Sequence, residues 1–271
     1  MIENSKKANL IQFEEQMHSQ TELPGKLIFF DDLHYISHRY RYVLDLADKK
    51  DILEIGAGSR IGKKEISTLS KSYIGLDISK KNISRCLPLE KEFGIKFIWG
   101  DAHNIPFADN SFNLIIALAM IYYLDIDNFL NEAKRILRPN GKLFFCTSNK
   151  CVKGFVPAPY TTKYYTVPEL DEILNNHGFT GRFKGAFEQK SSLLRSILIF
   201  IKNSIKFIFF TFRLKGYWPM MRNFYKGTKV TIPEELSDFP EFEVLTTPID
   251  PNVKDSRNRI IYCESELKVS N

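Results

Sequence analysis

The sequence contains little cysteine, and none of it forms a motif that builds a metal site or a disulfide framework. Four of the 271 residues are cysteines, and these are Cys86, Cys146, Cys151 and Cys263. Their spacings match no set of zinc ligands, and no other cluster of ligand residues stands out in the sequence. We therefore expect reduced thiols and no bound metal ion.

Long apolar runs are also missing. The first ten residues are polar and lack the apolar segment of a secretion signal. No stretch reaches the roughly 18 uncharged apolar residues that a membrane-spanning helix needs. Together with the reduced thiols, these absences predict a cytoplasmic protein. The apolar fraction of 44% and the charged fraction of 26% fit a globular chain with a sizeable core.

Positive charge exceeds negative charge. Lysine and arginine number 38 against 32 aspartates and glutamates, which gives a formal charge of +6. Such an excess favours an anionic partner, which could be a phosphate-bearing substrate, a membrane surface or a nucleic acid.

Predicted strands and helices alternate along much of the chain, as in a parallel sheet built from βαβ units. The predicted strands are 51–55, 72–77, 95–100, 112–117, 142–147, 179–187 and 259–267. The aromatic run 29–42 is expected to form a helix before the first strand. Helix 128–137 should end at Arg138-Pro139-Asn140-Gly141, where proline and glycine turn the chain into the next strand. A further helix is expected at 167–176.

A glycine turn follows the first predicted strand. In Leu53-Glu54-Ile55-Gly56-Ala57-Gly58, the two glycines allow a ligand to approach the backbone closely. Asp77 ends the next strand about 20 residues further on, where a carboxylate can bind ribose hydroxyls. Asp101 follows the third strand and could accept a hydrogen bond from an adenine amino group. Helix capping is the alternative role of both aspartates, but their place at one sheet edge predicts a nucleotide site.

Longer runs resemble the class I S-adenosylmethionine-dependent methyltransferases, in particular the group that contains the ubiquinone and menaquinone enzymes. The run from Gly100-Asp101-Ala102-His103 to Asn113 is similar to that group's link between its third and fourth strands. Residues 133–143 and 165–179 are similar to its next two segments. The resemblance implies S-adenosyl-L-methionine as cofactor and a Rossmann-like, doubly wound sheet of seven mostly parallel strands. The last strand, 259–267, would be antiparallel and lie beside the fifth.

The resemblance also implies the residues of the cofactor site. Glu54 would help to hold the methionine amino group, and Asp101 with the Ala102 backbone would bind the adenine. The full expected set is Glu54, Gly56, Ala57, Gly58, Asp77, Ile78, Asp101, Ala102, Leu118 and Tyr35. Two residues depart from the family's pattern, because Arg60 stands where a third glycine is usual and Asn113 replaces an aspartate. We expect the cofactor to bind despite both.

Other chemistries fit less well. A nicotinamide dehydrogenase typically needs a third glycine beside its pyrophosphate, where this chain has Arg60. Amino-methylating enzymes of nucleic acids resemble one another in an Asn-Pro-Pro-Tyr type of motif, where this chain has Ala117-Leu118-Ala119-Met120. The first observation disfavours a dehydrogenase, and the second disfavours methylation of a nucleic-acid base.

Candidate catalytic residues lie before the sheet and after its fourth strand. Methyl transfer is an in-line displacement, so an enzyme chiefly aligns donor and acceptor. A hydroxyl acceptor also benefits from a general base, most often histidine. The segment before the sheet commonly covers the cofactor in this family, which makes His34 and His38 candidate bases, with a surface or packing role as the alternative. Tyr122 and Tyr123 lie where many relatives carry histidine, facing the acceptor, and Tyr123 is the third candidate.

A basic and apolar insertion, 190–258, separates the last two predicted strands. Residues 189–233 contain nine lysines and arginines and no acidic residue. On a helix, the four residues of a basic stripe would share one narrow face. These are Arg195, Lys202, Lys206 and Arg213. The pattern predicts that 190–229 contacts an anionic membrane surface. A lid over the core is the alternative. A nucleic-acid surface is disfavoured, because the phenylalanines lie within aliphatic runs.

Four units are therefore predicted. They are a helical lid (1–46), a cofactor-binding core (47–189), the insertion (190–258) and a last strand with tail (259–271). The predicted function is methylation of a small or lipid-linked acceptor at the inner face of the membrane, with no obligate protein partner. O-methylation of a saccharide or glycolipid precursor is the first choice. The alternatives are C-methylation of a quinone-like or isoprenoid lipid, and a non-catalytic module that binds the cofactor and recruits a partner.

Overall fold

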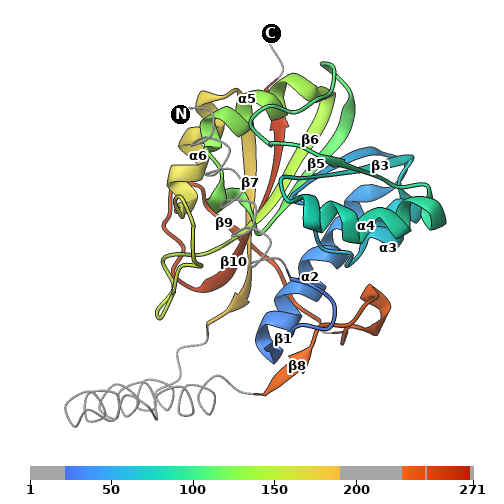
Figure 1. Cartoon of the computed structure of the whole chain (residues 1–271). Helices are drawn as coiled ribbons and strands as arrows, with labels where there is room; N and C mark the ends of the chain where they lie inside the picture. Colours follow the sequence, from blue (N-terminus) through green and yellow to red (C-terminus); the bar gives the residue numbers. More distant parts are fainter. Residues whose placement is uncertain (1–21, 190–227, 242, 269–271) are drawn as a thin grey trace, which may run out of the picture.

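One large sheet of eight strands dominates the computed structural model, which describes residues 22–189, 228–241 and 243–268 (Figure 1). The strands lie in the order β4-β3-β2-β5-β6-β10-β7-β9. Their bounds are β2 (Asp51–Ile55), β3 (Ser72–Asp77), β4 (Lys96–Trp99), β5 (Phe112–Leu118), β6 (Leu137–Ser148), β7 (Phe179–Glu188), β9 (Thr247–Ile249) and β10 (Asn258–Leu267). Strands β2 to β6 are parallel, and β10 lies antiparallel between β6 and β7. The predicted fold class is confirmed, and β9 adds an edge strand.

Helices cover both faces of the sheet, as in a doubly wound fold (Figure 1). They are α2 (Phe30–Ala47), α3 (Lys63–Leu69), α4 (Lys80–Phe93), α5 (Ile126–Ile136) and α6 (Val167–Asn176), with single turns η1 (Ile121–Tyr123) and η3 (Leu236–Asp238). Side chains alternate along each strand, so β5 serves two cores. Ile115 packs with α5 and α6, whereas Leu114 and Ile116 pack on the side of α2 and α4.

Strand β6 begins earlier than predicted. Helix α5 ends at Ile136, and Leu137 already pairs with Phe112 of β5. The next pair in register is Leu114 with Lys142, so Arg138-Pro139-Asn140-Gly141 form a bulge inside the strand. Asn140 has the left-handed φ of 62° that such a bulge can require. The prediction that these four residues form a turn between the helix and the strand is therefore wrong, because they belong to the strand.

The described end of the insertion packs against the N-terminal segment. Strand β1 (Leu27–Phe29) pairs antiparallel with β8 (Lys229–Thr231). Beyond β8, Ile232, Leu236 and Phe239 are buried in the same core as α2. The predicted basic stripe lies outside the described residues. Within those residues, no helix is long and apolar enough to cross a membrane.

Candidate active site

The glycine turn lies at the carboxyl end of β2, as predicted. Gly56 has a left-handed φ of 72°, which favours glycine. A Cβ on Gly58 would lie 2.5 Å from Asp77 Oδ2 and 2.3 Å from Asn82 Nδ2. Glycine at this position therefore lets the carboxylate at the end of β3 lie directly against the turn.

Asp77 presents a buried carboxylate, with 6% of the residue exposed. Its Oδ1 accepts a hydrogen bond from the Ser79 N–H at 2.7 Å and one from Asn82 Nδ2 at 3.4 Å. Burial raises the pKa of the Asp77 carboxyl group. The next residue, Ile78, accepts a hydrogen bond from the Trp99 indole through its carbonyl at 2.9 Å. A carboxylate beside a glycine turn suits ribose hydroxyls, so these residues fit the adenosyl group of the predicted cofactor.

Asp101 is held by the histidine two residues later. His103 Nδ1 lies 2.7 Å from Asp101 Oδ1, which also accepts the His103 N–H at 2.9 Å. His103 Nε2 accepts a hydrogen bond from the N–H of Asp125 at 3.0 Å. The ring proton is therefore on Nδ1, which donates a hydrogen bond to Asp101. The hydrogen bond from His103 lowers the pKa of Asp101, and Asp101 in turn raises the pKa of His103. Sequence reasoning gave His103 no role, yet it fixes the predicted adenine ligand beside the buried Ala102.

Glu54 has partners that the sequence did not suggest. Its carboxylate, on β2, accepts hydrogen bonds from Lys63 Nζ and from the Tyr73 hydroxyl. Glu54 is 1% exposed and Lys63 is fully buried. Burial disfavours the charge of Lys63, but Glu54, Tyr40 and Cys86 together outweigh this effect, so the pKa of Lys63 is raised. Both oxygens of Glu54 already accept a hydrogen bond inside the protein. Its role in holding a methionine amino group stays a prediction.

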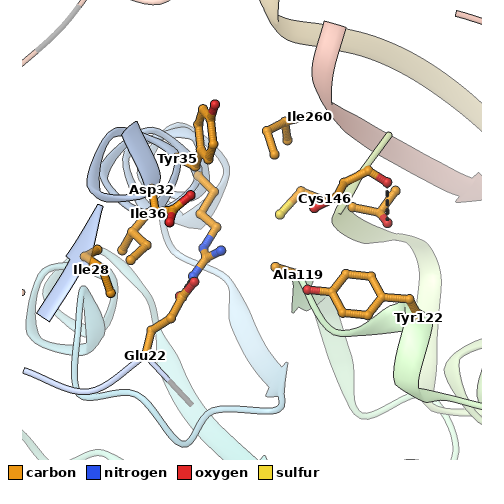
Figure 2. Close-up of a pocket in the computed structure, with 12 residues that line it drawn as sticks. Glu22, Ile28, Asp32, Tyr35, Ile36, Ala119, Tyr122, Cys146 and Ile260 are labelled. Atoms are coloured by element: carbon orange, nitrogen blue, oxygen red, sulfur yellow. Dashed lines mark hydrogen bonds and ion pairs between the residues drawn. The ribbon is translucent and has the colours of Figure 1, made fainter. Parts of the chain in front are cut away.

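A cavity of about 180 Å³ lies between α2 and the carboxyl ends of β5 and β6 (Figure 2). Its lining residues are Glu22, Ile28, Asp32, Tyr35, Ile36, Arg39, Ala119, Tyr122, Cys146, Thr147, Ser148 and Ile260. Figure 2 shows Tyr35 and Asp32 on one wall, with Tyr122 and Cys146 facing them. Met120 joins the cavity to the glycine turn, because it follows Ala119 and a Cβ on Gly56 would lie 3.3 Å from its side chain.

The predicted site residues are distributed unevenly around this cavity. Tyr35 lines it, and Leu118 immediately precedes its wall at Ala119, whereas the lining includes none of the three predicted catalytic residues. These are His34, His38 and Tyr123.

The three predicted catalytic side chains lie in different surroundings. His38 Nδ1 lies 2.7 Å from the Tyr262 hydroxyl, and burial lowers the pKa of His38. His34 packs edge-on against Phe30, and burial lowers its pKa as well. Burial raises the pKa of Tyr123 to about 12. Catalysis by these residues stays a prediction.

Tyr122, which was expected to face the acceptor, lines the cavity. Arg39 lines it too but was not among the predicted site residues. Arg39 is 7% exposed and lies on α2, one turn from Tyr35 and Ile36. That helical spacing was visible in the sequence. The opposite wall comes from segments more than 70 positions away, so the burial of Arg39 was not visible.

Comparison with known proteins supports the predicted family. The family model described as methyltransferase domain matches residues 53–145, which run from β2 into β6. Phthiotriol/phenolphthiotriol dimycocerosates methyltransferase 1 of Mycobacterium ulcerans is 34% identical over 111 residues, which are 40% of this chain and 41% of that protein. The fatty-acid O-methyltransferase of Mycolicibacterium smegmatis is 31% identical over 99 residues, 35% of this chain and 36% of that protein. The chain thus covers less than half the length of these relatives.

Solved structures share the fold at low sequence identity. The YcgJ protein of Bacillus subtilis has a TM-score of 0.54 at 16% identity, over 86% of this chain and 99% of that one. A methyltransferase from Thermotoga maritima, described as a possible histamine N-methyltransferase, has a TM-score of 0.51 at 16% identity, over 86% and 89%. With its glycine turn, strand-end carboxylates and matching residues 53–145, the chain carries a domain of the class I methyltransferase family, whose cofactor is S-adenosyl-L-methionine.

Proposed function

We propose that the protein transfers a methyl group from S-adenosylmethionine to a lipid or lipid-linked acceptor. The observation that carries this proposal is the cavity between α2 and the ends of β5 and β6. It adjoins the glycine turn through Met120, so a donor bound at the turn has room for an acceptor beside it. The apolar part of the lining, Ile28, Ile36 and Ile260, suits an aliphatic acceptor.

The residues of this chain would bind and orient the cofactor and the acceptor, and would exclude water from the site. S-adenosylmethionine supplies a methyl group on a positively charged sulfur. Asp77 and Asp101 would accept hydrogen bonds from the adenosyl group, and His103 holds Asp101 in place for this. Helix α2 forms one wall of the cavity and would keep water from the reacting groups.

The names of the relatives favour a lipid acceptor. One is named for phthiotriol and phenolphthiotriol dimycocerosates and the other for O-methylation of fatty acids. O-methylation of a saccharide or glycolipid precursor is our finer proposal. The hydroxyl groups of Thr147 and Ser148 in the lining support it, because they can hydrogen-bond a polar acceptor. C-methylation of a quinone-like lipid is the alternative.

Residues 190–229 would bring such an acceptor to the cavity by contacting an anionic membrane surface. The support is the absence of acidic residues from this stretch and its basic stripe. Strand β8 ends the stretch beside β1, and Ile28 of β1 lines the cavity. The route from the insertion to the acceptor site would therefore be short.

Methyl transfer itself is the test. The full chain is incubated with methyl-labelled S-adenosylmethionine and a cell-envelope lipid extract, and the organic phase is resolved by chromatography. We expect label in a lipid product with the wild type and far less with Asp77→Ala. Asp109→Ala, which changes an exposed carboxylate paired with Arg135, should behave like the wild type. Cofactor binding without transfer to any extract would favour the non-catalytic module.

A further inference from the structure

Arg39 brings a buried positive charge into the cavity. Its side chain is 9% exposed, and its Nε has no hydrogen-bond partner among the described residues. The charge reaches the opposite wall, where it lowers the pKa of Tyr122 and Cys146 against the stronger effect of their burial. A buried guanidinium with an unsatisfied N–H is costly, so this group is suited to a ligand that completes its hydrogen bonds.

Glu22 shows which chemistry this guanidinium accepts. Its carboxylate forms an ion pair with the NH2 group of Arg39. Glu22 precedes β1, belongs to no helix or strand and has a side chain 34% exposed. A side chain on an irregular, partly exposed segment can be displaced at lower cost than one on a packed helix. The Nε group of Arg39 is buried and has no hydrogen-bond partner among the described residues.

We propose that Arg39 is a carboxylate-binding residue of this cavity, and that Glu22 occupies its site until a ligand carboxylate displaces it. The inference rests on the proposed function, since it assigns a ligand group to the same cavity. Arginine binds carboxylates through two parallel hydrogen bonds. An incoming carboxylate can use both Nε and the NH2 group, whereas Glu22 pairs with the NH2 group.

Two ligands could supply the carboxylate. One is the methionine end of the cofactor, whose amino group would find Asp32 on the cavity wall. The other is an acceptor acid. In that case a carboxylate oxygen forms the new bond to the methyl carbon while the carbon–sulfur bond breaks, giving a methyl ester and neutral S-adenosylhomocysteine. This step moves no proton and needs no general base, which agrees with the lining, because none of the lining residues that the structure describes is a histidine.

Calorimetric titration of the full chain separates these sources without requiring turnover. S-adenosylhomocysteine is compared with 5′-deoxy-5′-methylthioadenosine, which lacks the amino acid end, and octanoate is compared with octanol. The variants are Arg39→Gln and Glu22→Gln. Arg41→Gln is the matched control, because Arg41 lies on the same helix and pairs with the exposed Glu241 outside the cavity.

We expect Arg39→Gln to weaken one carboxylate ligand by about 10- to 100-fold, the effect of a charged hydrogen bond, and to spare its matched neutral probe. Weaker binding of S-adenosylhomocysteine identifies the cofactor as the source of the carboxylate. Weaker binding of octanoate identifies the acceptor as its source. Glu22→Gln should strengthen the same ligand, because it removes the competing carboxylate.

Two results would overturn the inference. One is a folded Arg39→Gln variant that binds both carboxylates as Arg41→Gln does. The other, which decides the matter if Arg39→Gln fails to fold, is a Glu22→Gln variant that binds them no more tightly than the wild type. Failure of the wild type to bind S-adenosylhomocysteine would instead contradict the proposed function.

Discussion

The ring of Tyr40 lies against Gly62, so closely that a Cβ on Gly62 would be 2.7 Å from Tyr40 Cδ1. Tyr40 belongs to α2, and Gly62 ends the loop between the glycine turn and α3. The Tyr40 ring centroid also lies 5.1 Å from the ammonium group of Lys63. The helix before the sheet is therefore packed onto the loop of the cofactor site.

Gly62→Ala should cost more stability than a glycine substitution that strains the backbone alone. Gly62 has a φ of 71°, and alanine there would also displace the Tyr40 ring. Gly94 is the matched control, because its φ is 67° and a Cβ added there would meet no atom within 4 Å. We expect urea unfolding to give a loss of about 1 kcal/mol for Gly94→Ala and about 2–4 kcal/mol for Gly62→Ala. Equal losses would show that Tyr40 does not restrict the loop.

Lys63→Met should be strongly destabilising. It would leave the buried Glu54 with Tyr73 as its remaining partner, and breaking a buried ion pair costs about 3–5 kcal/mol. Lys64→Met removes an exposed pair with Glu235 and a contact of the ammonium group with the Phe93 ring, so it should change the unfolding free energy little. The double variant Glu54→Gln, Lys63→Met should lose less unfolding free energy than the sum of the losses in the two single variants. A near-neutral Lys63→Met would contradict the buried pair.

The Lys63 pair also predicts a pH dependence. The folded-state pKa of Lys63 is raised above its ordinary value of 10.5. Its stabilising contribution is therefore fully present below about 10.5 and is lost as the pH rises through the folded value. The stability difference between wild type and Lys63→Met should stay constant near neutral pH and shrink in alkaline urea titrations. A difference that already falls between pH 6 and pH 8 would argue against this pairing.

His103 should titrate above its ordinary pKa of 6.5, because Asp101 accepts its Nδ1 proton. The stability from this contact is present below 6.5 and is lost as the pH rises through the folded value. An NMR titration of the His103 ring should give a lower pKa in Asp101→Asn than in the wild type. The same pKa in both proteins would show that Asp101 does not hold His103.

Membrane contact by the insertion should depend on its basic stripe. Changing Arg195, Lys202, Lys206 and Arg213 to glutamine should reduce flotation with anionic vesicles, and added salt should do the same. The matched control changes four exposed lysines of the core, Lys49, Lys71, Lys91 and Lys96. Unchanged flotation of the stripe variant would contradict electrostatic docking.

The sequence predicted the parallel half of the sheet well. Strands β2 and β3 have the predicted bounds. Each is a largely apolar run with a clear local end, because the glycine turn follows β2 and Asp77 is the last residue of β3. The glycine turn and Asp77 follow from the same local signals. Strand β6 was misjudged at its start because Pro139 and Gly141 usually end an element, and only pairing with β5 reveals the bulge.

Contacts between distant segments could not be predicted. The pairing of β1 with β8 joins residues some 200 positions apart through two three-residue strands. The partner of Glu54 emerges only once α3 folds back over β2 and buries Lys63. The burial of Arg39 likewise depends on Glu22 and on the ends of β5 and β6.

Calorimetric titration of the full chain with S-adenosylmethionine tests the assignment of the cofactor site most directly. We predict saturable binding at one site per chain. Binding should be about 10- to 100-fold weaker in Asp77→Ala, because that change strands the hydrogen-bonding groups of the ribose. A wild-type chain that gives no binding heat at several temperatures would contradict the assignment.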